Sequence, residues 1–163
     1  MTLDPAKCLI LACGNALRED DGVGPWIAAW ASGRFQRDAR LRVESRQQWT
    51  PELAEEISQV DAAIFVDCSA TSPPGSIRIE PVLAADRIPN SLSHHLDAAD
   101  LLAMARDYYN SVPRASLLLT VGAGSLELRE GFSGIVEAAF PAACKRLEET
   151  VQQLLDAAEA HCA

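Results

Sequence analysis

Three short apolar runs constrain the fold of this 163-residue chain more than any other feature. They are KCLILAC at 7–13, DAAIFVD at 61–67 and SLLLTVGAG at 116–124. Each run is far shorter than the roughly 18 apolar residues that span a bilayer, and each has the length of a buried strand. Strands that are apolar throughout are typical of parallel sheets covered by helices on both faces. We therefore predict that these runs form the centre of such a sheet.

The segments between the runs complete an alternating order of strands and helices. Two further strands are predicted at 40–46 and 76–82, the second at an edge of the sheet. Helical spacing or helix-start signals predict helices at about 21–33, 50–58, 96–109 and 133–160. The order predicts an α/β fold: a three-layer α/β/α sandwich with a twisted, mainly parallel sheet of about five strands and helices on both faces. Residues 1–163 are expected to form a single domain.

Charge and cysteine content limit the classes of function. A formal net charge of −9 repels phosphate backbones and anionic lipid, so we expect neither nucleic acid binding nor membrane insertion. The apolar run near the start is interpreted as a strand rather than a signal peptide, which predicts a cytoplasmic protein. The five cysteines show no CxxC pairing and are expected to be reduced thiols. The role of Cys13 and Cys68, near two strand ends, stays open.

In open α/β sheets, ligands bind beyond the carboxyl ends of the strands. Here this rule indicates the Gly-rich segment 14–24, the segment 67–69 after a central strand, and the segment 91–95 before a helix. The first segment lacks the glycine spacing of a dinucleotide fingerprint and the Gly-Lys-Ser/Thr ending of a phosphate-binding loop. It carries Glu19, Asp20 and Asp21 instead, which would repel a phosphate. Helix capping explains one carboxylate, for example Asp20, and leaves Asp21 over.

The other two segments supply a carboxylate and an imidazole. Asp67 ends an apolar strand, where a turn aspartate is the alternative interpretation. His94 and His95 precede a helix, where capping is the alternative. Two carboxylates and one imidazole at the same sheet edge form a ligand set suited to nickel, zinc, manganese or iron, without selecting among them. Three protein ligands leave positions open for a substrate.

The same residues resemble the nickel–iron hydrogenase maturation endopeptidases. GNALREDDGVGPW (14–26) is similar to the motif that opens this family, and AAIFVDCS (62–69) to its strand ending in Asp. PPGSIRIEP (73–81) is similar to its turn into a strand, and SLSHHLDAADLL (91–102) to its histidine before a helix. The landmarks follow in the family's order over about residues 8–155.

The resemblance implies a hydrolase that removes the C-terminal extension of a hydrogenase large-subunit precursor after nickel insertion. Carried over by motif, the metal-contacting residues are Asp21, Asp67 and His94, with His95 as a second candidate. The metal is expected to be nickel supplied by the substrate precursor, and other divalent cations can take its place in the isolated protein. The segment 121–131 lacks the proline that many members carry there, so the resemblance does not identify the hydrogenase that is served.

For the reaction, the predicted catalytic residues are Asp20, Asp21, Asp67 and His94, with Asp20 or Asp21 as general base toward water. Two alternatives belong to other classes of protein. One is a nickel-sensing binding module or chaperone for the large subunit without proteolytic activity. The other is a nucleotide- or flavin-binding doubly wound protein, which the sheet alone would allow.

Overall fold

A computed structural model describes residues 6–90 and 95–162 of the chain. The strands are β1 (Cys8–Cys13), β2 (Leu41–Arg46), β3 (Ala62–Ser69), β4 (Ile77–Pro81) and β5 (Ala115–Gly122). The helices are the short 3-10 helix η1 (Glu19–Gly22), α1 (Val23–Arg34), α2 (Leu53–Ser58), α3 (Ala98–Tyr109) and α4 (Gly134–Cys162). Among the described residues, no helix is long and apolar enough to cross a membrane.

The five strands form one sheet in the order β2-β1-β3-β5-β4. The strand β1 pairs in parallel with β2 and β3, and β3 pairs in parallel with β5. The strand β4 is antiparallel to β5 and lies at one edge, as predicted, while β2 forms the other edge. The mainly parallel sheet expected from the three apolar runs is thus confirmed.

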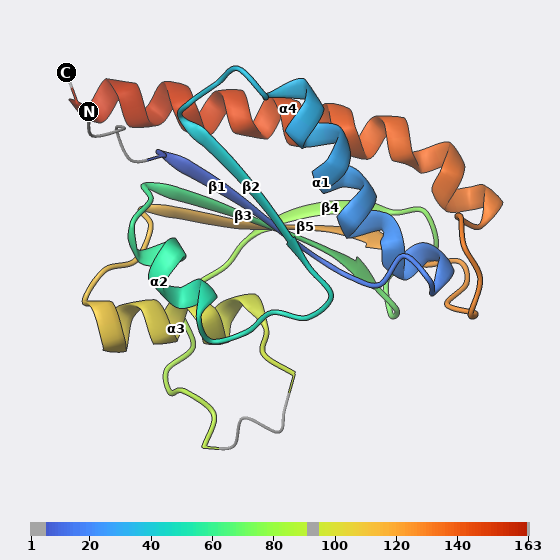
Figure 1. Ribbon diagram of the computed structural model, residues 1–163, viewed down its shortest axis with the longest axis horizontal. Coiled ribbons are helices and arrows are strands. Elements are labelled where there is room, and N and C mark those ends of the chain that lie inside the picture. The colour runs from blue at the N-terminus through green and yellow to red at the C-terminus, as the bar shows by residue number, and fades with distance from the viewer. Residues whose placement is uncertain (1–5, 91–94, 163) are drawn as a thin grey trace.

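Helices cover both faces of this sheet, which confirms the three-layer sandwich. Figure 1 shows α1 and α4 on one face and α2 and α3 on the other. Alternate residues of β1 separate into the two cores: Ile10 packs toward α1 and α4, whereas Leu9 and Leu11 pack toward α2 and α3. Because all three side chains are fully buried, β1 is apolar throughout.

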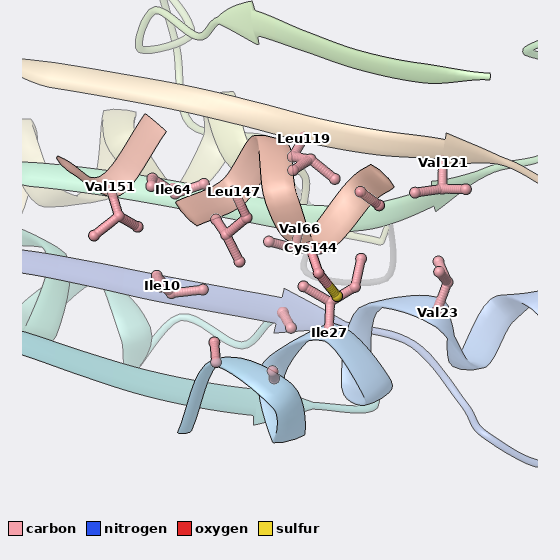
Figure 2. Packing of buried hydrophobic residues seen from close by; sticks show 14 of the residues in the cluster. Ile10, Val23, Ile27, Ile64, Val66, Leu119, Val121, Cys144, Leu147 and Val151 are labelled. Atoms are coloured by element: carbon pink, nitrogen blue, oxygen red, sulfur yellow. The ribbon is translucent and has the colours of Figure 1, made fainter. Parts of the chain in front are cut away.

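The core between the sheet and α1/α4 is made mainly of aliphatic side chains. Figure 2 shows Ile64 and Leu119 of the sheet facing Ile27 of α1 and Leu147 and Val151 of α4. Each fully buried side chain of this size contributes about 1.5–3 kcal/mol relative to its exposed state. These contacts fix α1 against the sheet, and the turn that precedes α1 is held with it.

The start of the first helix differs from the prediction. The helix was expected to begin close to Asp21, but Glu19–Gly22 form a 3-10 turn and α1 begins at Val23. Neither element has a side-chain N-cap, so helix capping, the alternative explanation for Asp20, does not apply. The three acidic residues of this turn have other partners, described below.

A close approach of backbones holds the N-terminal end of α1 against β1. A Cβ atom added at Gly24 would lie 2.3 Å from the carbonyl oxygen of Cys13, which is well inside van der Waals contact. Only a residue without a side chain fits there. At Gly33, in the last turn of the same helix, an added Cβ would meet nothing within 4 Å.

This contrast predicts opposite effects of the same substitution in one helix. We expect Gly24→Ala to lower the free energy of unfolding by about 1–3 kcal/mol, because the added methyl group forces α1 away from β1. The matched variant Gly33→Ala should raise it by about 0.5–1 kcal/mol through helix propensity. Urea denaturation measures both values. Equal effects of the two variants would contradict the close approach of α1 to β1.

Candidate active site

A cavity of about 700 Å³ opens at the carboxyl edge of the sheet. Its walls come from the ends of β1 and β3, from the segments that follow β1 and β2, and from the residues just before α3, as expected for a parallel α/β sheet. Asp21, Asp67 and His95 all line this cavity. The structure therefore brings together two of the three predicted metal ligands and the second histidine candidate.

Asp67 lies near the carboxyl end of β3 and is half-buried. Burial raises the pKa of its carboxyl group to about 6, the backbone N–H of Cys68 opposes this shift, and the negative charge of Asp21 adds to it. The N–H of Cys68 donates to Oδ1 of Asp67 at 2.8 Å. One hydrogen bond does not replace the lost hydration of a carboxylate. The charged form of Asp67 is therefore destabilised relative to the protonated form.

Asp21 reaches the cavity because the segment 14–21 folds back on itself. Its Oδ2 accepts a hydrogen bond from the backbone N–H of Asn15 at 2.8 Å. Gly14 makes this turn possible, since its φ is +147° and an added Cβ would lie 1.9 Å from the carbonyl oxygen of Asp21. The glycine at the start of the motif is therefore required by the geometry that orients the carboxylate.

The imidazole is described only in part. His95 lies on the cavity wall and is exposed, whereas His94, the predicted metal ligand, lies outside the described residues. Over residues 6–90 and 95–162, no group of three or more His, Cys, Asp or Glu side chains is arranged to hold a metal ion. Within that part of the chain, the cavity offers the oxygen donors of Asp21 and Asp67 and the exposed ring of His95.

Asp20, one of the two predicted candidates for the general base, does not line the cavity. Its side chain is fully buried. Its Oδ2 accepts from the N–H groups of Gly124 at 2.7 Å and Ser125 at 2.9 Å and from the hydroxyl of Ser133 at 2.6 Å. Its Oδ1 accepts from the N–H of Ser133 at 2.8 Å. Burial alone would raise the pKa of Asp20, but these hydrogen bonds hold it below its usual range.

Glu19 fastens the same loop from the other side of the turn. Its side chain is buried and pairs with Arg129, whose Nε donates to Oε1 at 2.7 Å. The backbone N–H of Glu19 also donates to the carbonyl of Arg129 at 2.8 Å. The three acidic side chains therefore have different surroundings: Glu19 pairs with Arg129, Asp20 with the loop 124–133, and Asp21 lines the cavity. The sequence did not predict that the three acidic residues have different partners. The only local indication is that three acidic residues follow one another.

Two thiols complete the polar lining. Cys13 and Cys68 border the cavity, and Sγ of Cys13 donates to the carbonyl of Gln47 at 3.4 Å. Burial, together with the charges of Asp21 and Asp67, raises the pKa of each thiol to about 12. Both therefore stay protonated at neutral pH, and neither has the thiolate character of a cysteine nucleophile.

The hydrogen bonds of Asp20 predict a large effect of a nearly isosteric change. Asp20→Asn should lower the free energy of unfolding by roughly 2–4 kcal/mol, because an amide nitrogen cannot accept from the donors of the loop 124–133. Ser133→Ala, which removes only one hydroxyl donor, should cost about 1 kcal/mol. Thermal unfolding followed by circular dichroism measures both. A loss no greater for Asp20→Asn than for Ser133→Ala would contradict the anchoring role of Asp20.

The raised pKa of Asp67 predicts a variant that is more stable than the parent. Between pH 3.8 and about 6 the folded state keeps a proton that the unfolded state has lost, so stability falls as pH rises through this window. Asp67→Asn removes the group that titrates, and with it this pH-dependent fall in stability. Its free energy of unfolding should match that of the parent near pH 3.5 and exceed it by up to about 3 kcal/mol at pH 7.5. Urea titrations with a chelator present test this, and a pH-independent difference would contradict it.

Comparison with solved structures places this site in a known fold. The hydrogenase maturating endopeptidase HybD from E. coli superposes with a TM-score of 0.69 at 22% sequence identity, covering 90% of this chain and 93% of that one. An endopeptidase from Escherichia coli has a TM-score of 0.70 at 25% identity, with the same coverage. A nickel–iron hydrogenase maturation protease, HycI from Thermococcus kodakarensis KOD1, has a TM-score of 0.65 at 20% identity over 93% of both chains.

At the level of sequence, no protein-family model and no curated protein matches the chain. The structural likeness nevertheless spans nine-tenths of the chain. It gives no support to the two alternatives, a non-proteolytic nickel-sensing module and a nucleotide- or flavin-binding protein. The resemblance predicted from the sequence is confirmed by the structure: this chain has the fold of the hydrogenase maturation endopeptidases.

Proposed function

We propose that this protein is an endopeptidase that removes the C-terminal extension from the large-subunit precursor of a nickel–iron hydrogenase. One observation carries the proposal. Two carboxylates from separate segments, Asp21 in the turn after β1 and Asp67 near the end of β3, line one cavity at the carboxyl edge of a sheet whose fold is shared with maturation endopeptidases. The acidic surface suits a protein substrate better than a nucleic acid. In this proposal the partner is the precursor, and processing takes place in the cytoplasm.

The nickel ion belongs to the substrate and is recognised by the enzyme's own side chains. Asp21 and Asp67 offer carboxylate oxygens, and His94 or His95 offers an imidazole nitrogen, which together suit a divalent transition metal. The two carboxylates repel each other and Asp67 is poorly hydrated, so a dication between them would relieve both costs. Precursor without nickel offers no such gain. The site is thereby biased toward loaded precursor.

Hydrolysis then requires water, a base and a scissile bond held beside them. Asp21 is the carboxylate best placed for general-base catalysis, since it lines the cavity and Oδ2 is engaged only by the Asn15 N–H among the described residues. Both carboxylate oxygens of Asp20 already accept hydrogen bonds from the loop 124–133. The raised pKa of the Cys13 and Cys68 thiols disfavours a thiolate nucleophile, and in this proposal water attacks the scissile bond.

Substitution of the predicted site residues tests this proposal. Asp21→Asn and Asp67→Asn should each reduce cleavage of the nickel-loaded precursor by at least about 100-fold, because each removes a metal contact or the base, and His94→Ala should do the same if His94 is the liganding histidine. Intact-mass spectrometry of the precursor, before and after incubation, measures the loss of the extension. His95→Ala in parallel identifies the histidine that matters: the ligand's variant should lose activity and the other variant should keep it.

Asp156→Asn is the matched control, since Asp156 is an exposed carboxylate on α4 that does not line the cavity. It should cleave at the parent rate. Near-normal cleavage by all of the Asp21, Asp67, His94 and His95 variants would contradict the proposed site. A parent protein that binds loaded precursor without changing its mass would contradict the proposed reaction.

A further inference from the structure

The strand β2 is an open edge that leads into the cavity. Among the described residues it pairs with β1 on one side only and is the last strand of the sheet, as Figure 1 shows. Its last residue, Arg46, continues directly into the segment 47–52, which forms one wall of the cavity. An extended chain that paired with the outer side of β2 would therefore be guided to the carboxylates.

The hydrogen-bonding pattern identifies the outward groups of β2. The N–H of Cys8 donates to the carbonyl of Arg40 at 3.0 Å, and the N–H of Gly14 donates to that of Arg46 at 3.1 Å. In a parallel ladder, residues alternate in the neighbour that they face, with N–H and C=O on the same side. The even-numbered residues from 40 to 46 therefore face β1. The N–H and C=O groups of Val43 and Ser45 point away from the sheet.

These outward groups are only lightly covered. In the described parts of the chain, the one side-chain hydrogen bond to them runs from Nη1 of Arg46 to the carbonyl of Ser45 at 3.0 Å. This arginine is exposed, so moving it costs little. Ser45 is itself exposed and Val43 is half-buried. Short strands and flanking charges commonly protect such edges from unwanted pairing, and exposed edges are also used to bind extended peptides.

We propose that the C-terminal extension of the precursor binds as an added strand on β2. This inference rests on the proposed function. The added strand runs antiparallel to β2, because the residues before the scissile bond are tied to a folded subunit and cannot lie along the edge. The residues after the bond belong to a free chain end. They can leave the cavity beside the segment 47–52 and run back from Ser45 toward Leu41.

Such a site recognises backbone more than side chains. Six residues of strand provide a track of roughly 20 Å, and Val43 and Ser45 each contribute one donor and one acceptor. The charged side chains of β2 are already paired within the enzyme: Arg46 contacts Glu44 at 2.8 Å, and Arg42 contacts Glu56. The ligand class is therefore an extended peptide segment of several residues with free backbone N–H and C=O groups and a tolerant sequence.

Proline at position 45 tests the added strand. Ser45→Pro removes an outward N–H that the ladder with β1 does not use, and prolines are tolerated at such edge positions. We expect KM for the nickel-loaded precursor to rise about tenfold with kcat nearly unchanged, as for loss of binding contacts away from the reacting bond. The matched variant Ser45→Ala keeps the N–H and should behave as the parent. Thermal unfolding of the two variants compares their stability.

Amide hydrogen exchange of the parent protein provides a measurement that does not depend on a variant that folds. A synthetic peptide with the sequence of the precursor's extension should slow exchange at Val43 and Ser45 but not at Ile79, on the opposite edge strand β4. Cleavage by the parent with equal KM for both Ser45 variants, or unchanged exchange at Val43 and Ser45, would overturn the added strand and leave the proposed function standing. Failure of the parent to cleave any loaded precursor would instead overturn the function.

Discussion

The buried carboxylate of Asp20 is the interaction on which the site depends. Its two oxygens accept four hydrogen bonds from Gly124, Ser125 and Ser133, and so join the turn after β1 to the loop between β5 and α4. These segments are more than 100 residues apart in the chain. Glu19 and Arg129 add a second fastening beside the first. With two of the three acidic side chains fixed in this way, the third, Asp21, is held toward the cavity.

The cavity itself is electrostatically costly in the free protein. Asp67 loses hydration by its position at the end of a buried strand and gains repulsion from Asp21, and both effects raise its pKa. A protein that needed only stability would not keep this arrangement, since an uncharged side chain would fit the strand end better. The cost is understandable if a cation completes the site. The same desolvation and repulsion that destabilise the two carboxylates without a metal would then favour binding of a cation.

Much of this architecture follows from the sequence because the responsible forces are local. The runs around Ile10 and Ile64 are apolar throughout since both faces of their strands are covered, and that pattern predicts a parallel sheet. Because β1 and β3 are parallel, the segments that follow them lie at the same edge of the sheet, and this places Asp21 and Asp67 there.

The missed features depend on contacts between distant segments. Nothing in the run Glu19–Asp20–Asp21 indicates which carboxylate is buried, because the partners of Asp20 come from the loop 124–133. The start of α1 was misplaced for a related reason: the acidic residues bind that loop instead of capping the helix. The choice between His94 and His95 stays a prediction, since adjacent residues differ by one position and the first lies outside the described residues.

The central claim is that Asp21 and Asp67 share one divalent cation. Anomalous diffraction at the nickel absorption edge, from crystals of the protein grown with Ni²⁺, tests it most directly. The account predicts a single strong peak within about 2–2.5 Å of a carboxylate oxygen of each aspartate. A cavity without a peak, in crystals where nickel is bound at another site such as the exposed His161, would contradict it.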